Sequence, residues 1–449
     1  MNEYIKSITA FHLARLRSGL GPELAGHAKL CLLDSVGCML ASRRDCEKEL
    51  AFIAEMSPHG ECTVPGTGLR LSMPLAAFAG SALALAQELD DATSVGASVH
   101  PGCCVIPAAL AAAEKNCSRP QELLEAILFG YDLCNRLGLM ATEKIRELGL
   151  YGPGLIAAPS AAAAAGLLMG LEQGQIENAI SIALSMSPVC PFCAFTDGAD
   201  VKNLYAGWGT YLGVLSAQMA KEGFTGADDV LDAEKSLRGI FSSTKGRDIT
   251  PADGKYERAV QFKKYSGCLS VHATMEAIAS LRAAGGFSAE DIESVQIETY
   301  PYACDLNRLT KRLNAISART SLTYTAAVML IEGRLGPEAF RPGALVNPEY
   351  LRLKEKITVK TIPASESGPF GGRDSVVTLK LQDGRVMTGR YESAGHQAEA
   401  TAEQLRAKFL SINEAGPDGS QLEALADMIL NIDGAESLEK MFEALNTLP

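Results

Sequence analysis

The chain has 449 residues, of which 47% are hydrophobic and 21% are charged, as in an ordinary globular protein and unlike a disordered one. Its length exceeds what one core usually supports, so we expect two domains. With 41 Lys and Arg against 53 Asp and Glu, the net charge is −12. An acidic chain repels nucleic acid, and no basic stripe with interleaved aromatic residues offsets this. We therefore predict no nucleic-acid partner.

Two segments bear on membranes and export. The first ten residues contain one lysine and no apolar run before a small-residue cleavage site, so they do not resemble a signal peptide. The longest uncharged stretch, Leu148–Leu171, is long enough to span a membrane. It is rich in glycine, proline and alanine, however, which favours a tightly packed buried helix after a loop. We predict a cytoplasmic protein with no membrane partner.

The twelve cysteines follow no regular spacing. Without an export signal, reduced and buried thiols are expected. Cys190 and Cys193 form the only CxxC pair, and no second pair or neighbouring histidines complete a zinc site. An iron–sulfur cluster that uses a third, distant cysteine stays as an alternative.

The first 260 residues have the spacing of apolar residues that is typical of consecutive helices. No clear strand is expected here. The predicted helices cover 74–89, 106–114 with Pro107 in its first turn, 121–141, 176–186 and 206–222.

The pattern changes after about Ser266. Apolar residues alternate with polar ones in several short segments, which predicts half-buried strands. Asp383-Gly384 separates two such segments and favours a hairpin with a type I′ turn. The predicted elements are a helix over 271–284, a strand over 294–300, a helix over 322–332 ending at Gly333, strands over 357–361, 377–381 and 385–391, and helices from 401 onwards.

These patterns predict a mainly α protein with a large all-helical domain and a smaller α+β domain. We place the helical domain at 1–265 and the α+β domain at 266–395. The C-terminal helices, 396–449, are expected to return to the helical domain. We find no internal repeat and no phosphate-binding glycine fingerprint.

Two adjacent carboxylates, Asp90 and Asp91, stand where the helix predicted over 74–89 ends and a loop leads to His100. Negative charge at a helix C-terminus costs about 0.3–1 kcal/mol per exposed group, and a local rule broken without compensation indicates function. Adjacent residues diverge, so one carboxylate could orient His100 or a substrate hydroxyl while the other caps the loop. His100 precedes proline, which favours an extended backbone. On spacing alone, a solvated helix end with a loop histidine stays possible.

Two lysines also stand out. Lys202 precedes an apolar helix start rich in small residues, and Lys263 lies at the junction of the two predicted domains. Such junctions favour small-ligand clefts, and lysine is a point charge suited to carboxylates, although surface lysines are far commoner. The six histidines include no HxH or HxxxH pair, so we predict no histidine-rich metal site.

Six segments, in order, resemble signatures of the MmgE/PrpD family, which includes 2-methylcitrate dehydratase, cis-aconitate decarboxylase and iminodisuccinate epimerase. Single segments are weak signals, but six in order are specific, and together they span nearly the whole chain. The segments are Glu88–Thr93 with His100–Gly102, Gly130-Tyr131-Asp132, Ser160–Leu171, Lys202–Trp208, Phe262–His272 and Arg319–Ala327.

The resemblance implies a large helical domain with a smaller lid-like α+β domain, a homodimer, and activity without a metal or organic cofactor. It also implies a site between the domains that binds a small polycarboxylate. By position, the residues lining that site would be Asp90, Asp91, Thr93, His100, Lys202, Lys263 and Tyr324.

The chain departs from the family at three positions. Tyr151 and Cys268 stand where decarboxylase-like members carry histidines, and Ser266 replaces a proline. We assign Tyr151 and Cys268, with Thr93 and Lys263, to substrate binding. The two replaced histidines favour dehydration or epimerisation over decarboxylation.

We hypothesise proton abstraction beside a carboxylate, followed by loss of a β-leaving group or by reprotonation. Lys202 and Lys263 would stabilise the enolate-like dianion, and His100 would be the general acid or base. Asp90 or Asp91 would orient His100, and Tyr324 would protonate the opposite face. The alternatives are cis-aconitate decarboxylase-like activity and a non-catalytic polycarboxylate-binding protein on the same scaffold.

Overall fold

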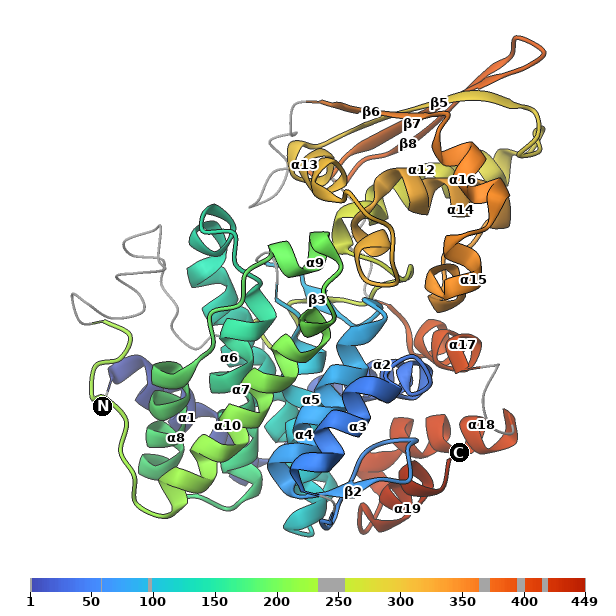
Figure 1. The fold of residues 1–449 in the computed structure, drawn as a ribbon. Coiled ribbons are helices and arrows are strands. Elements are labelled where there is room, and N and C mark those ends of the chain that lie inside the picture. The colour runs from blue at the N-terminus through green and yellow to red at the C-terminus, as the bar shows by residue number, and fades with distance from the viewer. Residues whose placement is uncertain are drawn as a thin grey trace. The chain divides into compact units, whose positions relative to one another are not determined.

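The computed structural model describes residues 2–57, 59–95, 99–232, 255–362, 372–393, 400–413 and 419–448. The fold is mainly helical, with a large helical unit and a smaller α+β unit (Figure 1). The helical unit comprises 1–191, 203–262 and 400–449, and the α+β unit comprises 192–202 and 263–399. Residues 192–202, which the sequence placed in the helical domain, thus group with the α+β unit. The predicted boundary at 395–396 lies outside the described residues.

The helices predicted in the first 260 residues are confirmed, with ends that differ by a few residues. The helical unit contains α1 (Glu3–Ser18), α2 (Pro22–Ser42), α3 (Glu47–Met56), α4 (Met73–Ala86), α5 (Pro101–Lys115), α6 (Pro120–Glu147), α7 (Gly152–Leu168), α8 (Gln173–Met186), α10 (Tyr205–Lys221), α17 (Ala402–Asn413), α18 (Gly419–Leu430) and α19 (Glu439–Thr447).

Helix α7 is the centre of the helical unit. It is buried along its whole length and packs against α5, α6, α8 and α10. Its small residues allow close backbone approach: a Cβ on Gly213 of α10 would lie 2.3 Å from the carbonyl oxygen of Ala158. The prediction of a tightly packed buried helix within 148–171 is confirmed.

Among the described residues, α2 is the one helix long and apolar enough, by length and composition, to cross a membrane. In the structure, 67% of its most apolar window is buried. The C-terminal helices α17 and α18 pack against it. This burial is what a core helix shows, and the same packing brings residues near the chain's end beside residues near its start.

The prediction for α5 was wrong in one respect. Pro101, not Pro107, takes the first turn, and Pro107 lies inside the helix. A proline inside a helix cannot donate to the carbonyl four residues earlier, here that of Cys103. That carbonyl instead accepts a hydrogen bond from the hydroxyl of Ser81 at 2.6 Å, so the neighbouring helix α4 compensates for the proline.

Two short antiparallel ladders in the helical unit were not predicted. β1 (Cys62–Thr63) pairs with β2 (Arg70–Leu71), and β3 (Ala92–Thr93) pairs with β4 (Val260–Gln261). A strand of two residues is too short for alternation to appear in the sequence. The β3–β4 ladder matters here because β3 directly follows Asp91.

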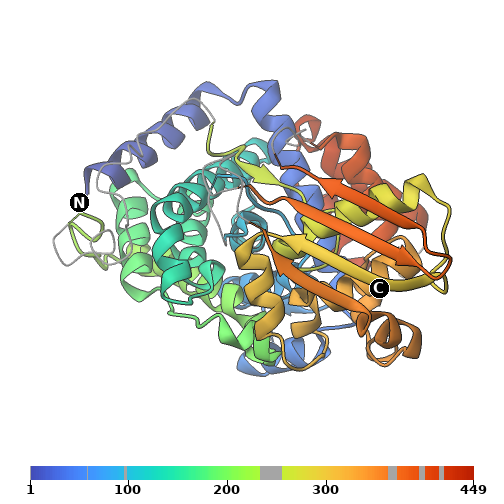
Figure 2. The same ribbon diagram turned by 90° about the horizontal axis from the view of Figure 1, so that it is seen from above.

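The α+β unit contains a four-stranded sheet in the order β6 (Ile357–Thr361), β5 (Ile292–Thr299), β7 (Ser375–Leu381), β8 (Val386–Tyr391). Figure 2 shows the strands side by side. β5 and β6 are parallel, and the other two pairings are antiparallel. Helices α12 (Leu269–Ala284) and α14 (Leu322–Glu332) pack against the sheet. The predicted strands and helices of this unit are confirmed, including the end of α14 at Gly333, which is left-handed with a φ of 74°.

The predicted β7–β8 hairpin is confirmed, but its turn type was wrong. A type I′ turn requires positive φ at both Asp383 and Gly384, and only Gly384, at 87°, has it. The N–H of Gly384 donates to the carbonyl of Leu381, whose N–H bonds the carbonyl of Arg385. This is a type I turn followed by a glycine bulge.

Candidate active site

The turn after α4 has an unusual backbone at Glu88. Glu88 has a φ of 50°, in the left-handed region that glycine usually occupies after a helix. For another residue this conformation costs about 1–3 kcal/mol and persists only when its surroundings hold it. The buried Glu88 carboxylate accepts a hydrogen bond from the hydroxyl of Tyr151 at 2.8 Å. Strain of this kind is common at functional sites.

His100 lies at the start of α5, with an extended φ of −129° as the following proline predicts. Its Nδ1 is 3.1 Å from Oδ2 of Asp90, which is fully buried. An ionised Asp90 keeps the proton on Nδ1, so Nε2 becomes the atom that exchanges protons. Within the part of the chain that the structure describes, Nε2 of His100 has no hydrogen-bond partner.

Asp91 has a different role from Asp90. Its two oxygens accept hydrogen bonds from the N–H of Gly102 and the hydroxyl of Tyr131, each at 2.7 Å. Burial raises the pKa of Asp91 to about 7, and the charge of Asp34 adds to the effect. A Cβ on Gly102 would lie 2.9 Å from Oδ1 of Asp91, so this contact needs glycine. Asp90 orients the imidazole, while Asp91 fixes the start of the helix that carries it.

Tyr151 lies at the start of α7, beside His100. The centroids of the two rings are 6.5 Å apart, and burial, reinforced by the charge of Glu88, raises the pKa of Tyr151 well above its ordinary value. The phenol therefore stays protonated and serves as a hydrogen-bond donor. We call Glu88, Asp90, His100 and Tyr151 the site cluster.

Thr93 does not offer its hydroxyl to a ligand in this structure. It lies in β3, where its N–H bonds the carbonyl of Val99 and its hydroxyl donates to the carbonyl of Ala259 at 3.3 Å. The side chain supports the β3–β4 ladder, and a substrate-binding role for Thr93 gains no support from this geometry.

Tyr324 was expected to protonate the substrate, and the structure does not support that role. Its side chain lies in the core of the α+β unit, and its hydroxyl donates to the carbonyl of Ala339 at 2.6 Å. The tyrosine is fully buried. Its proton is used to tie α14 to the segment that follows it.

The three other predicted residues of the α+β unit are Lys202, Lys263 and Cys268. Both lysines are only 1% exposed, and Nζ of Lys202 lies 4.4 Å from the centre of the Phe195 ring. Cys268 precedes α12, with its N–H bonded to the carbonyl of Arg319 at 2.9 Å. Their roles in carboxylate binding stay predictions.

Two groups of buried side chains have the spacing of a metal site. Glu88, Asp90 and His100 each offer one ligand atom, and these atoms lie within 4.8 Å of one another. Two carboxylates and an imidazole suit a divalent cation. The second group is described below. Within the described residues neither group includes a cysteine, so the iron–sulfur alternative gains no support.

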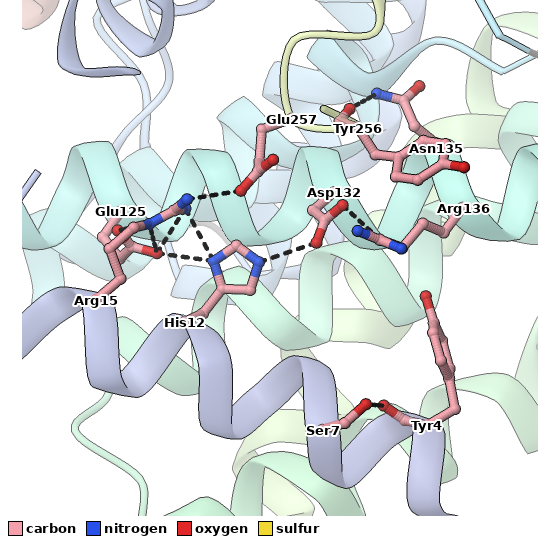
Figure 3. A network of polar contacts seen from close by, with 10 residues as sticks. All are labelled: Tyr4, Ser7, His12, Arg15, Glu125, Asp132, Asn135, Arg136, Tyr256 and Glu257. Atoms are coloured by element: carbon pink, nitrogen blue, oxygen red, sulfur yellow. Dashed lines mark hydrogen bonds and ion pairs between the residues drawn. The ribbon is translucent and has the colours of Figure 1, made fainter. Parts of the chain in front are cut away.

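The second group belongs to a network of charged residues between α1 and α6 (Figure 3). Nδ1 of His12 is 2.7 Å from Glu125, and its Nε2 is 3.2 Å from Asp132. Burial alone would lower the pKa of His12, but its hydrogen bonds to these two carboxylates outweigh burial and raise the pKa. We call the full set the His12 network: His12, Arg15, Glu125, Asp132, Arg136 and Glu257.

Three cations face three carboxylates in the His12 network. Nη1 of Arg15 is 2.7 Å from Glu257, and Nε of Arg136 is 2.5 Å from Asp132. With His12 protonated, the charges cancel, and no extra cation is needed. We interpret this network as structural, despite its metal-like spacing.

Comparisons with known proteins agree with this architecture. Residues 8–250 match the MmgE/PrpD N-terminal domain, and residues 265–433 match the MmgE/PrpD C-terminal domain. The chain belongs to the MmgE/PrpD family.

Several relatives of this MmgE/PrpD protein are cis-aconitate decarboxylases. The enzyme of Aspergillus terreus is 26% identical over 93% of this chain and 91% of its own length. The human enzyme is 26% identical over 85% of this chain and 78% of its own, and the mouse enzyme is 24% identical over 94% and 86%. Our preference for dehydration or epimerisation is therefore weakened, and the decarboxylase alternative is the better supported of the two.

The site of this MmgE/PrpD protein also includes residues that we did not predict. Glu88 and Tyr131 stood within the matching segments but had no assigned role. In Gly130-Tyr131-Asp132, each residue has a separate contact: a Cβ on Gly130 would lie 2.4 Å from Val105, Tyr131 bonds Asp91, and Asp132 bonds His12. The motif was a signal for all three contacts, but not for their partners.

Proposed function

We propose that this chain is a lyase that removes CO₂ from cis-aconitate or a closely related small polycarboxylate, with His100 as the proton-transfer residue. The observation that carries the proposal is the Asp90–His100 pair, which fixes Nδ1 and leaves Nε2 of His100 available among the described residues. The named activity of the relatives supports the choice of substrate.

Decarboxylation fits this pair as follows. The C–C bond to a carboxylate beside an allylic carbon breaks, CO₂ leaves, and the electron pair spreads over the double bond. Nε2 of His100 donates a proton to the far carbon of that system, which forms a C–H bond and yields an unsaturated dicarboxylate. Asp90 holds the imidazole in place and stabilises its cationic form before transfer. Solvent then returns the proton to His100.

A second candidate is dehydration of a hydroxy polycarboxylate such as 2-methylcitrate. Dehydration needs a base for the proton beside the carboxylate and an acid for the departing hydroxyl. The site cluster offers two such groups, because the Tyr151 phenol is held by Glu88 next to His100. Tyr151 would be the acid in this reaction.

A single assay separates these reactions. The purified chain is incubated in heavy water with cis-aconitate, 2-methylcitrate or iminodisuccinate, and the products are followed by NMR. Loss of CO₂ with one deuterium in the product supports decarboxylation. Loss of water from 2-methylcitrate supports the second candidate. If every acid binds but none reacts or exchanges a proton, the chain is a binding protein and the proposal is wrong.

We further propose that the reaction needs no metal. The spacing of Glu88, Asp90 and His100 makes this worth testing. Activity should survive dialysis against a chelator, with no transition metal found by elemental analysis. Activity that is lost on dialysis and restored by one divalent cation would contradict cofactor independence and assign these residues as ligands.

We also propose that the enzyme is a cytoplasmic homodimer. The family resemblance supports the dimer, and the absence of a recognisable export signal in the first ten residues supports the location. Light scattering after size exclusion tests the first point, and fractionation of the source cells tests the second.

A further inference from the structure

Lys408 of α17 reaches the turn that carries the site cluster. Its Nζ donates to Oδ1 of Asp34 at 2.5 Å and to the backbone carbonyl of Leu89 at 2.7 Å. Leu89 lies between Glu88 and Asp90. The ammonium group thus fastens the one peptide that joins the two carboxylates of the site cluster, from a position 319 residues later in the chain.

The Lys408 side chain is only 13% exposed, and that of Asp34 is 1% exposed. Burial alone would lower the pKa of Lys408, but the carboxylate of Asp34 outweighs burial, and that of Asp90 adds to the effect. The side chain therefore stays charged inside the protein. A charged donor makes a stronger hydrogen bond to a carbonyl than a neutral one does.

The turn at Glu88 needs such support. Its left-handed backbone is unfavourable for a residue with a Cβ, so the turn relaxes unless contacts on both sides hold it. Tyr151 holds the Glu88 side chain, and Lys408 holds the next carbonyl. The direction of the Asp90 carboxylate toward His100 depends on this peptide.

We propose that Lys408 is a positioning residue for the reaction: by fixing the Leu89 carbonyl, it keeps Asp90 aimed at Nδ1 of His100. The inference rests on the proposed function for its kinetic consequence. Its structural consequence, the state of the His100 imidazole, is independent of any substrate.

The chain offers a matched control for a purely structural role. Nζ of Lys29 on α2 pairs with Asp433 at 2.8 Å. This ion pair also ties α2 to the C-terminal helical segment, but it does not touch the turn at Glu88. Lys29→Met and Lys408→Met therefore both remove a link to the C-terminal segment, and only Lys408→Met releases the Leu89 carbonyl.

The first readout is the tautomer of His100, measured by NMR on protein with ¹⁵N-labelled histidine and assigned with His100→Gln. Native protein and Lys29→Met should keep the proton on Nδ1, whereas Lys408→Met should give a mixture of tautomers. If Lys408→Met does not fold, Asp34→Asn and Lys408→Arg provide the same readout. Identical His100 signals in native protein and in every Lys408 or Asp34 variant would overturn the inference.

The second readout is kinetic. Lys408→Met should lower kcat by about 10- to 100-fold, as expected for a misplaced catalytic group, with KM changed by less than about 3-fold. Lys29→Met should leave both close to native values. Equal losses in the two variants would mean that the C-terminal segment acts only through stability. If native protein turns over none of the acids, the proposed function fails, while the tautomer measurement still decides the role of Lys408.

Discussion

The helical unit contains two buried histidines that face carboxylates, and they differ in how their contacts are completed. Both nitrogens of His12 face carboxylates, arginines balance the charge, and its side chain is fully buried. His100 has one nitrogen on Asp90, and its side chain is 9% exposed. Among the described residues its other nitrogen is left for a ligand. A completed network contributes to stability, whereas an incomplete one can carry out chemistry.

The two clusters are also connected. Arg15 holds Glu257, and Asn135 donates to the carbonyl of Tyr256 at 2.7 Å. The chain then continues into β4, which pairs with β3 next to Asp91. The His12 network thus supports the frame of the site cluster without taking part in it. The comparison predicts that substitutions at His100 affect turnover, while substitutions at His12 affect folding.

The largest effect is expected for His100→Gln. Loss of the proton-transfer group should lower kcat/KM by about 10²- to 10⁴-fold, while the thermal midpoint stays near the native value because Nε2 has no partner to lose. Steady-state kinetics and calorimetry measure the two quantities. The control is His59→Gln, since His59 is exposed. Near-native turnover by His100→Gln would remove His100 from the mechanism.

The converse is expected for His12→Leu. Removing the imidazole leaves Glu125 and Asp132 buried without their shared cation, which should lower the free energy of unfolding by about 3–5 kcal/mol. Turnover per folded molecule should change by less than about 3-fold. Urea titration gives the first value, and kinetics at low temperature gives the second. A stable His12→Leu protein without activity would reverse our assignment of the two clusters.

The His12 network should also depend on pH. Because the folded pKa of His12 is raised above its usual value of 6.5, its stabilisation is fully present below that pH and is lost as the pH rises through the folded pKa. Native protein should therefore lose stability from pH 6.5 upwards by more than His12→Leu does. Parallel stability curves for the two proteins would contradict a charged His12.

A smaller effect is expected for Tyr151→Phe. The substitution removes one hydrogen bond to a buried carboxylate, worth about 1.5–3 kcal/mol. If Tyr151 is the acid of a dehydration, Tyr151→Phe should reduce water loss far more than proton exchange catalysed by His100. Comparing the two rates on 2-methylcitrate tests this. Equal reduction of both would mean that Tyr151 acts only by holding Glu88.

The smallest effect is expected for Asp91→Asn, whose amide oxygen can still accept from Gly102. Since the folded pKa of Asp91 is raised from 3.8 to about 7, the folded state binds a proton more tightly than the unfolded state does. Stability should therefore fall between these values by about 1.4 kcal/mol per pH unit in native protein. Asp91→Asn should lack this slope and keep most activity. An unchanged slope would mean that Asp91 is ionised throughout.

Features that depend on neighbouring residues could be predicted from the sequence. The end of α14 at Gly333, the β7–β8 hairpin, the buried helix within 148–171 and the extended backbone of His100 each follow from a local pattern. The family resemblance was also visible, because six segments matched in order. The turn type at Gly384 was missed, because Asp-Gly suits two turns that differ only in the φ of Asp383.

The Asp90–His100 stretch shows what only the tertiary structure decided. Two identical carboxylates stand side by side in the sequence, and the left-handed turn at Glu88 determines that Asp90 faces His100 while Asp91 faces Gly102. Tyr324 carries the same hydroxyl as Tyr151, but packing of the α+β unit buries it against a backbone carbonyl. Lys408 reaches the turn from the opposite end of the chain. Local sequence determines which groups are present and the backbone around them, whereas long-range packing determines which atoms meet.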